Sequence, residues 1–382
     1  MDIELTPAQH ALTLELREYF RDLMSTSERE ALLVERHGET YRAVVRRMGR
    51  DGWLGVGWPQ EYGGRGFGLV EQQIFVNEAA RADIPLPGVT LQTVGPTLQV
   101  FGTPAQKDFF LPRILAGEIH FAIGYTEPEA GTDLASLRTA AVRDGDTYVV
   151  NGQKIFTTGA HDADFIWLAV RTDPKAAKHK GISILIVDTS DPGYTWTPII
   201  TCDGAHHVNA TYYSDVRVPA DMLVGTENAG WRLITTQLNH ERVMLGPAGR
   251  LAAIYERVRD WAAQRDLLDE PDVRRALAKA RANTRVNELL NWQVAAAGAD
   301  VSIADASATK VFQSDRIQWL NRTLEEVVGT HGDPADPGTG ELMRWLDVQA
   351  KRNLVLTFGG GVNEVQRELI AMAGLNLPRV PR

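Results

Sequence analysis

The sequence predicts an α+β fold, with an N-terminal helical domain, a central antiparallel β domain and a C-terminal helical bundle. Apolar residues recur at helical spacing in the first 120 residues and again after residue 226. Between them, β-branched and aromatic runs alternate with tight-turn sequences. The 382-residue length fits two to three domains of about 150 residues each. We therefore expect domains at 1–120, 121–225 and 226–382.

The N-terminal domain opens with a helix-start signal. Thr6 is a capping hydroxyl, Pro7 suits the first turn, and Gln9 lies three residues after the cap. Further helices are expected over 41–51, 70–82 and 106–115. The segment 55–68 contains six glycines and one proline, which predicts a loop.

The central domain contains two hairpin-turn sequences within ten residues. These are Asp144-Gly145-Asp146 and Asn151-Gly152, and both are typical of tight turns between antiparallel strands. Runs rich in β-branched and aromatic residues predict strands over 165–171, 182–188 and 211–218. A small, mostly antiparallel sheet is therefore expected.

The C-terminal domain is dominated by amphipathic patterns. They predict helices over 233–261, 272–297, 304–328 and 342–356, with a last one over 363–373. Four glycines and two prolines within 329–340 predict a loop between two of these helices.

Charge and cysteine content exclude several kinds of protein. Forty Lys and Arg against 49 Asp and Glu give a net charge of −9 without a basic run, so neither nucleic acid nor an anionic membrane is an expected partner. The single cysteine, Cys202, excludes an intrachain disulfide and a multi-cysteine metal site. The N-terminus lacks a secretory pattern, and the apolar stretch 182–187 is too short to span a membrane. We expect a soluble, cytoplasmic protein.

Two segments of the β domain are candidate ligand sites. The run 125–133 (Tyr-Thr-Glu-Pro-Glu-Ala-Gly-Thr-Asp) offers backbone N–H groups and hydroxyls around a turn, which suit carbonyls or phosphates. A capped turn between domains accounts for it equally well and is more common. The run 151–159 places an aromatic residue beside two threonines, which could hold a flat ring. An ordinary hairpin strand is the alternative.

Two further candidates lie in the C-terminal domain. Glu241 falls three and four residues from Leu238 and Leu245, so it is expected near an apolar helix face, where desolvation would raise its pKa toward that of a useful base. A salt bridge to a neighbouring Arg is the alternative. Gly359-Gly360-Gly361 could let the backbone approach a ligand or could serve as a hinge. His206-His207 has no metal-ligand spacing with a cysteine, so an exposed loop pair and no metal site are expected.

Together, these segments resemble the acyl-CoA dehydrogenase family over nearly the whole chain. The run 126–133 (Thr-Glu-Pro-x-Ala-Gly-Thr-Asp) is the most specific signal, and the Asn-Gly-x-Lys run at 151–154 follows at the expected distance. Further matches in register are 57–64, 101–107, 215–219 and 230–231. The resemblance implies FAD at a subunit interface, oxidation of an acyl-CoA substrate to the α,β-enoyl-CoA, and an acceptor of the electron-transfer flavoprotein type.

Residue roles follow from the same resemblance. The positions that match flavin contacts are Tyr125, Thr126, Gly131 and Thr132. Thr132 also falls near the thioester tail of the substrate. Phe156 stands where most members have Trp against the isoalloxazine ring, and Thr158 matches the hydroxyl that bonds the flavin near N5.

The catalytic base departs from the common family pattern. Most members carry a catalytic Glu in a late loop, and the matching position here is Gly360, which has no carboxylate. A minority branch, which includes isovaleryl- and long-chain enzymes, carries the base on an earlier helix immediately before an Arg. The matching pair is Glu241-Arg242. The resemblance implies that Glu241 removes the α-proton, that Arg242 contacts the substrate region and that the Gly360 N–H still faces the thioester oxygen.

Two acidic segments predict a second chain. Family members hold the FAD pyrophosphate and adenine of a neighbouring subunit with two motifs, but this chain has acidic residues at both, in 265–270 and 328–333. With matching runs at 58–59, 125–133, 204–207, 241–250 and 357–364, the chain resembles the Glu-bearing subunit of actinobacterial heterotetrameric acyl-CoA dehydrogenases of steroid side-chain degradation. That resemblance implies a 2+2 heterotetramer with a related subunit, and a steroid-CoA with a short or shortened side chain as substrate. A non-catalytic scaffold subunit and a same-fold flavin monooxygenase are the alternatives.

Overall fold

A computed structural model describes residues 4–244 and 246–378, with the side chains of 238–244 and 299 outside the described part. The chain divides into two compact units. One, which we call the β unit, combines Ser27–Gly66 with Leu86–His240. The other, the helical unit, combines Met1–Thr26, Phe67–Pro85 and Glu241–Arg382. In the described residues, no helix is both long enough and apolar enough to cross a lipid bilayer.

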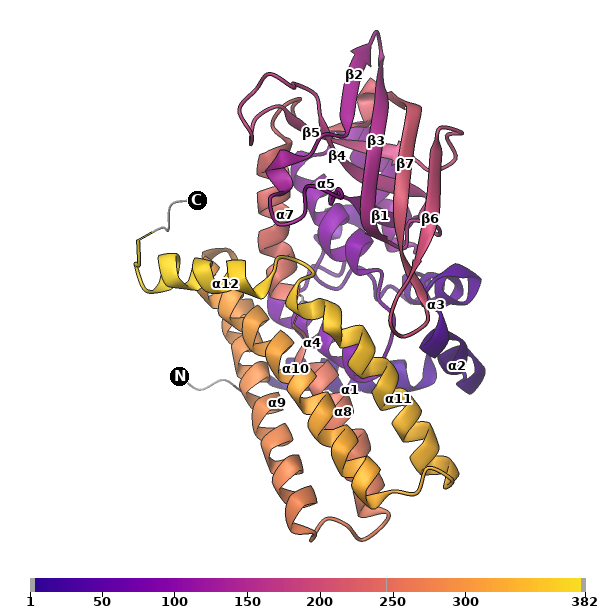
Figure 1. Cartoon of the computed structure of the whole chain (residues 1–382), viewed down its shortest axis with the longest axis vertical. Coiled ribbons are helices and arrows are strands. Elements are labelled where there is room, and N and C mark those ends of the chain that lie inside the picture. Colours follow the sequence, from indigo (N-terminus) through magenta and orange to yellow (C-terminus); the bar gives the residue numbers. More distant parts are fainter. Residues whose placement is uncertain (1–3, 245, 379–382) are drawn as a thin grey trace. The chain divides into compact units, whose positions relative to one another are not determined.

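The β unit is built on one eight-stranded sheet. Its strand order is β6-β7-β3-β2-β4-β5-β8, with β1 paired in parallel to β4 (Figure 1). Most pairs are antiparallel, as the sequence predicts. The strands are β1 (Phe121–Gly124), β2 (Ala140–Asp144), β3 (Thr147–Thr158), β4 (Phe165–Arg171), β5 (Ile182–Asp188), β6 (Tyr194–Ile200), β7 (His206–Pro219) and β8 (Leu223–Val224).

One predicted turn is wrong. Asp144-Gly145-Asp146 does connect β2 to β3, but β3 continues through Asn151 and Gly152. The register with β7 shifts between Val150 and Gly152, so the pair forms a bulge instead of a second hairpin turn. Gly152 has φ +150°, and a Cβ there would lie 2.7 Å from the Thr139 hydroxyl. Glycine is therefore required by close packing at this bulge, which explains why its sequence resembles a turn.

Four helices of the β unit lie before the sheet in sequence. They are α2 (Thr26–Val34), α3 (Gly38–Arg50), α5 (Gly95–Phe101) and α6 (Pro104–Leu115), with a short 3₁₀ turn at Gln60–Tyr62 inside the predicted 55–68 loop. The helix α7 (Gly230–Met244) follows the sheet, and the division between the two units falls within it, after His240.

The helical unit contains α1 (Pro7–Asp22), α4 (Leu69–Arg81), α8 (Ala248–Ala263), α9 (Pro271–Ala297), α10 (Ile303–His331), α11 (Pro337–Asn353) and α12 (Asn363–Leu369). The capping box at Thr6 and Gln9 is confirmed. Helix α10 packs against α8, α9, α11 and α12, which makes it the centre of a helical bundle (Figure 1). The predicted α+β architecture is therefore confirmed.

Two helix boundaries in the helical unit differ from the prediction. The single helix expected over 233–261 is two helices, since α7 ends at Met244 and α8 begins at Ala248. Two buried asparagines hold this break, because Asn287 and Asn291 each donate from Nδ2 to the Gly246 carbonyl oxygen at 2.9 Å. The loop expected over 329–340 is shorter, since α10 continues to His331 and α11 begins at Pro337.

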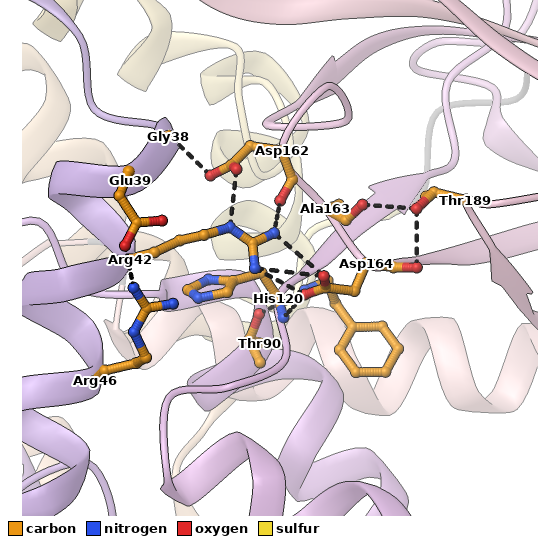
Figure 2. A network of polar contacts seen from close by, with 11 residues as sticks. Gly38, Glu39, Arg42, Arg46, Thr90, His120, Asp162, Ala163, Asp164 and Thr189 are labelled. Carbon is orange, nitrogen blue, oxygen red and sulfur yellow. Dashed lines mark hydrogen bonds and ion pairs between the residues drawn. The ribbon is translucent and has the colours of Figure 1, made fainter.

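An arginine network fastens α3 to the sheet. Figure 2 shows the Arg42 guanidinium between two carboxylates, with its Nε 2.9 Å from Asp162 Oδ1 and its Nη1 3.2 Å from Asp164 Oδ2. The same carboxylates accept backbone N–H groups, from Gly38 at 2.9 Å and from His120 at 2.8 Å. Each acid therefore has both a cation and a backbone donor, so the network holds the start of α3 against the segment that precedes β4.

The His120 ring makes stability in the β unit dependent on pH. It is 5% exposed, and among the described residues no hydrogen-bond partner lies at its Nε2. Burial, and then the nearby Arg42 cation, lower the pKa of His120 to about 4, against 6.5 for an unperturbed His. On acidification, the His120 ring is therefore protonated at a higher pH in the unfolded chain than in the folded chain. The resulting stability is fully present above pH 6.5 and is lost as the pH falls toward about 4.

Replacing His120 by Gln removes this titration. At about 1.4 kcal/mol per pH unit, the His120 contribution lost between pH 6.5 and 5 is about 2 kcal/mol. Between pH 7 and 5, the free energy of unfolding of His120→Gln, measured with urea, should fall by about 2 kcal/mol less than that of the wild type. The matched control is His179→Gln at an exposed position of the same unit. Equal pH dependence in wild type and His120→Gln would contradict this explanation.

Candidate active site

The first two candidate segments are joined in the structure. The loop after β1 is bonded to β3, because Ile155 N–H donates to the Thr126 carbonyl oxygen at 2.8 Å. One residue earlier, Lys154 Nζ donates to the Tyr125 carbonyl oxygen at 3.1 Å. The backbone of the 125–126 segment is therefore fixed against the strand that carries Phe156 and Thr158.

A buried ion pair forms the centre of this attachment. Lys154 Nζ lies 2.8 Å from Glu127 Oε1, and the Lys154 side chain is completely buried. Glu127 also accepts Arg138 N–H at 2.7 Å, Thr139 N–H at 2.8 Å and the Thr139 hydroxyl at 2.7 Å. The sequence motif contains both charged residues, but their pairing was missed because nothing in the spacing shows that the loop folds back onto β3.

Lys154 and Glu127 are both charged at neutral pH. Burial lowers the pKa of Lys154 to about 8, although Glu127 opposes this by favouring the cation. Burial alone would raise the pKa of Glu127, but Lys154 and Thr139 outweigh it and lower that pKa. At neutral pH the carboxylate is therefore satisfied by one cation and three further donors.

The Tyr125 ring links the loop to α7. Its hydroxyl donates to the Gln237 side-chain oxygen and accepts from Trp167 Nε1 at 3.1 Å. Gln237 is buried. The loop is thus tied to α7 as well as to β3, and the sequence had not indicated Gln237 or Trp167.

Phe156 occupies an unusual conformation for an aromatic residue. Its φ is +60°, and its register with β7 is lost between Lys154 and Thr157. The side chain is 60% exposed, so burial in its own chain does not offset that strained backbone. Thr158, also exposed, pairs with Val208 of β7. Strain of this kind is concentrated at functional sites.

The exposed groups on this part of the β unit fit a flat heteroaromatic ligand. An aromatic ring and a nearby hydroxyl, from Phe156 and Thr158, can contact a ring face and bond a ring heteroatom. At the loop tip, Gly131 and Thr132 are exposed, and a Cβ on Gly131 would meet nothing within 4 Å. Packing within the described chain therefore does not require glycine there, and the position is open to a ligand.

In the helical unit, the glycine loop before α12 has left-handed backbone. Gly360 has φ +64° and Gly361 has φ +95°. The end of the loop is anchored by buried Asn363, whose Oδ1 accepts Lys310 Nζ at 2.6 Å and whose Nδ2 donates to Asp315 Oδ1 at 2.9 Å. The loop therefore has one end fixed to α10, with its Gly360 backbone half-buried.

Glu241 and Arg242 belong to α7, but their side chains lie outside the described part of the structure. Position 241 is four residues after Gln237 in that helix.

Of the two acidic segments, 265–270 contains an Arg that is engaged within its own unit. Arg265 forms an ion pair with Asp336, the residue that caps the start of α11. Its neighbours Asp266, Asp269 and Glu270 are exposed, as is Asp333 in the second segment. Both segments therefore expose carboxylates.

Comparison with known proteins identifies the family. Residues 6–118, 122–216 and 228–375 match the family descriptions "Acyl-CoA dehydrogenase" N-terminal, middle and C-terminal domain, respectively. The chain is 70% identical to acyl-CoA dehydrogenase FadE29 of Mycobacterium tuberculosis, with all of both chains covered.

Solved structures agree with this comparison. One chain of the Tcur3481-Tcur3483 steroid ACAD superimposes with a TM-score of 0.94 at 49% identity, and one of the ChsE4-ChsE5 complex from Mycobacterium tuberculosis with 0.92 at 50% identity. Both comparisons cover all of both chains. The chain is therefore a member of the acyl-CoA dehydrogenase family, whose proteins are FAD-dependent oxidoreductases.

Proposed function

We propose that this chain is the base-bearing subunit of a heteromeric acyl-CoA dehydrogenase that converts a steroid side-chain acyl-CoA into its α,β-enoyl-CoA in the cytoplasm. The observation that carries the proposal is the attachment of Tyr125 to Gln237. It ties the loop with the expected flavin contacts to the helix that contains Glu241, one turn before that residue.

Glu241 is the proposed base. Removal of an α-proton requires a carboxylate near the substrate, and at position 360, where most family members carry it, this chain has glycine. Arg242, directly after the base, is proposed to contact the substrate region. The hydrogen bond from the Tyr125 hydroxyl to Gln237, in the same helix, supports this proposal.

The enolate-like charge that develops at the thioester oxygen requires hydrogen-bond donors. We assign one to the backbone N–H of Gly360, which the left-handed loop presents without a side chain. Thr132 is proposed to lie along the thioester tail. The absence of a side chain at Gly360 also leaves room for a bulky acyl group.

FAD fits the exposed groups of the β unit. Phe156 would lie against the isoalloxazine ring, Thr158 would bond near N5, and the loop would contribute Tyr125, Thr126, Gly131 and Thr132. When bound, FAD supplies at N5 the acceptor for the hydride that leaves the β-carbon. The Lys154–Glu127 pair holds this loop in place before any ligand arrives.

The partner is proposed to be a related acyl-CoA dehydrogenase subunit in a 2+2 heterotetramer, with electrons passing to an electron-transfer flavoprotein-type acceptor. Two observations support a second chain. The Arg265 guanidinium is already paired with Asp336, and the exposed acids nearby would repel a diphosphate. Two of the similar solved structures are also named for two different chains, and one of these is a steroid ACAD.

Anaerobic reduction of the bound flavin tests the function. The chain is co-expressed with a related acyl-CoA dehydrogenase subunit, and the purified complex is mixed with a short-side-chain steroid acyl-CoA. We expect rapid bleaching of the flavin absorbance, and reduction by palmitoyl-CoA to be slower by at least about 100-fold, because a substrate lacking matched contacts loses several kcal/mol in the transition state. Equal rates with both substrates would contradict the steroid assignment.

The chain purified alone is the control for the partner. It should contain little FAD, whereas a homotetramer with a full complement of FAD would refute the need for a second chain. Oxygen-dependent turnover without an added electron acceptor would instead identify a monooxygenase.

A further inference from the structure

Four histidines of the β unit gather beside the end of β3. His161 stacks on His206 with ring centroids 3.9 Å apart, and His37 lies 4.8 Å from His161 and 6.0 Å from His207. His206 and His207 were expected to form an exposed loop pair, and this prediction is wrong. Both are partly buried at the start of β7.

The segment that carries His37 is held rigidly. Gly38 N–H donates to Asp162, and Arg42 joins Asp162 to Asp164 one helical turn later (Figure 2). On the other side, the ring of His37 lies against Gly159, since a Cβ built there would be 2.8 Å from His37 Cε1. The position of His37 is therefore fixed by contacts outside the histidine cluster itself.

Two of the four imidazoles form hydrogen bonds with the side-chain amide of one buried asparagine. Asn209 is completely buried, and its Oδ1 lies 2.7 Å from His206 Nε2. Its Nδ2 lies 3.0 Å from His161 Nδ1 and 3.2 Å from the Thr157 carbonyl oxygen. His161 and His206 thus serve as supports for the cluster, oriented by one asparagine on β7.

The remaining histidines converge on a carboxylate. Ligand atoms of Glu35, His37 and His207 all lie within 4.8 Å of one another. Among the described residues, no hydrogen-bond partner lies at the buried Oε1 of Glu35. A buried carboxylate oxygen without a donor is costly, which points to a missing cation.

A second carboxylate orients one of these two histidines. His207 Nε2 lies 3.2 Å from Asp203 Oδ2, the carboxylate–histidine arrangement that commonly orients a metal-binding imidazole.

We propose that Glu35, His37 and His207 form a binding site for Zn²⁺. Two imidazoles and one carboxylate are a ligand set that Zn²⁺ accepts, whereas Mg²⁺ and Ca²⁺ prefer oxygen ligands alone. The ion connects the segment between α2 and α3 to β7, next to the strand pair that contains Thr158 and Val208. The site does not depend on the proposed dehydrogenase activity.

Zinc content and thermal unfolding of the tag-free chain test the site. The chain is first treated with a chelator and then titrated with ZnSO₄. Elemental mass spectrometry should then find one bound Zn²⁺ per chain, and the melting temperature should be higher than without the metal. In His37→Ala, His207→Ala and Glu35→Gln, zinc affinity should fall by more than about 100-fold. Asp203→Asn should weaken it by about 10–100-fold, because that residue only orients a ligand.

The control is His10→Ala, which removes an exposed histidine of α1 and should leave zinc affinity unchanged. Circular dichroism of each variant without metal distinguishes a lost ligand from a misfolded chain. Wild-type protein that binds no Zn²⁺ at micromolar concentration, or variants that retain wild-type affinity, would overturn the proposal. Flavin content and activity are not used as readouts, so failure here leaves the proposed function untouched.

Discussion

Replacing Glu241 by Gln is expected to slow anaerobic flavin reduction by the acyl-CoA by about 10²–10⁴-fold, the usual contribution of a positioned general base. Gln has nearly the shape of Glu but cannot accept the α-proton. The measurement is stopped-flow absorbance of the co-purified complex, with saturating steroid acyl-CoA. FAD content should remain at the wild-type level, because the groups proposed to hold the flavin belong to the β unit.

The matched control is Glu364→Gln, the same chemical change at an exposed carboxylate of α12 next to the glycine loop. It should reduce flavin at the wild-type rate. Undiminished reduction in Glu241→Gln would remove Glu241 from its proposed role. A loss of FAD in proportion to the lost rate would assign that residue to structure instead of proton transfer.

Local sequence signals predicted most of the secondary structure. The strands over 165–171 and 182–188 are confirmed with the same bounds, because continuous β-branched and aromatic runs identify buried strands without any long-range information. The helix start at Thr6 was likewise predicted from neighbouring residues alone. The fold class is therefore recoverable from periodicity and turn residues alone.

Errors arose where distant residues decide a local structure. Asn151-Gly152 has the composition of a hairpin turn, but pairing with β7 and contact with Thr139 make it a bulge. The break between α7 and α8 depends on the amides of Asn287 and Asn291, which no pattern near Gly246 can indicate.

In the candidate site, too, local patterns indicated some residues, whereas contacts between distant elements could not be predicted. An aromatic residue beside two threonines suggested a ring site at Phe156, with an ordinary hairpin strand as the alternative, and the family resemblance then implied its place against the flavin. Gln237 and the pairing of Glu127 with Lys154 were missed, because each partner lies on a different element. The zinc ligands are also distant in sequence, with Glu35 and His37 before α3 and His207 on β7. Metal-ligand spacing therefore could not reveal them.

The Lys154–Glu127 pair is expected to have the largest effect on stability of any single contact described in the β unit. Exposed ion pairs contribute about 0–1 kcal/mol, but removing one partner of a buried pair typically costs about 3–5 kcal/mol. The penalty arises because the remaining charge is left buried. Lys154 also donates to the Tyr125 carbonyl oxygen, so its removal affects the loop proposed to hold the flavin.

Lys154→Met should therefore lower the free energy of unfolding by about 3 kcal/mol, the lower end of that range, because Arg138 and Thr139 still donate to Glu127. Urea unfolding of the chain measures the loss, and the FAD content of the complex should fall with it. Lys178→Met is the matched control, since Lys178 pairs with Asp133 of the same loop but both side chains are more than half exposed. Its cost should stay below about 1 kcal/mol. If both variants lost the same small amount, the Lys154–Glu127 pair would not be what fixes the loop.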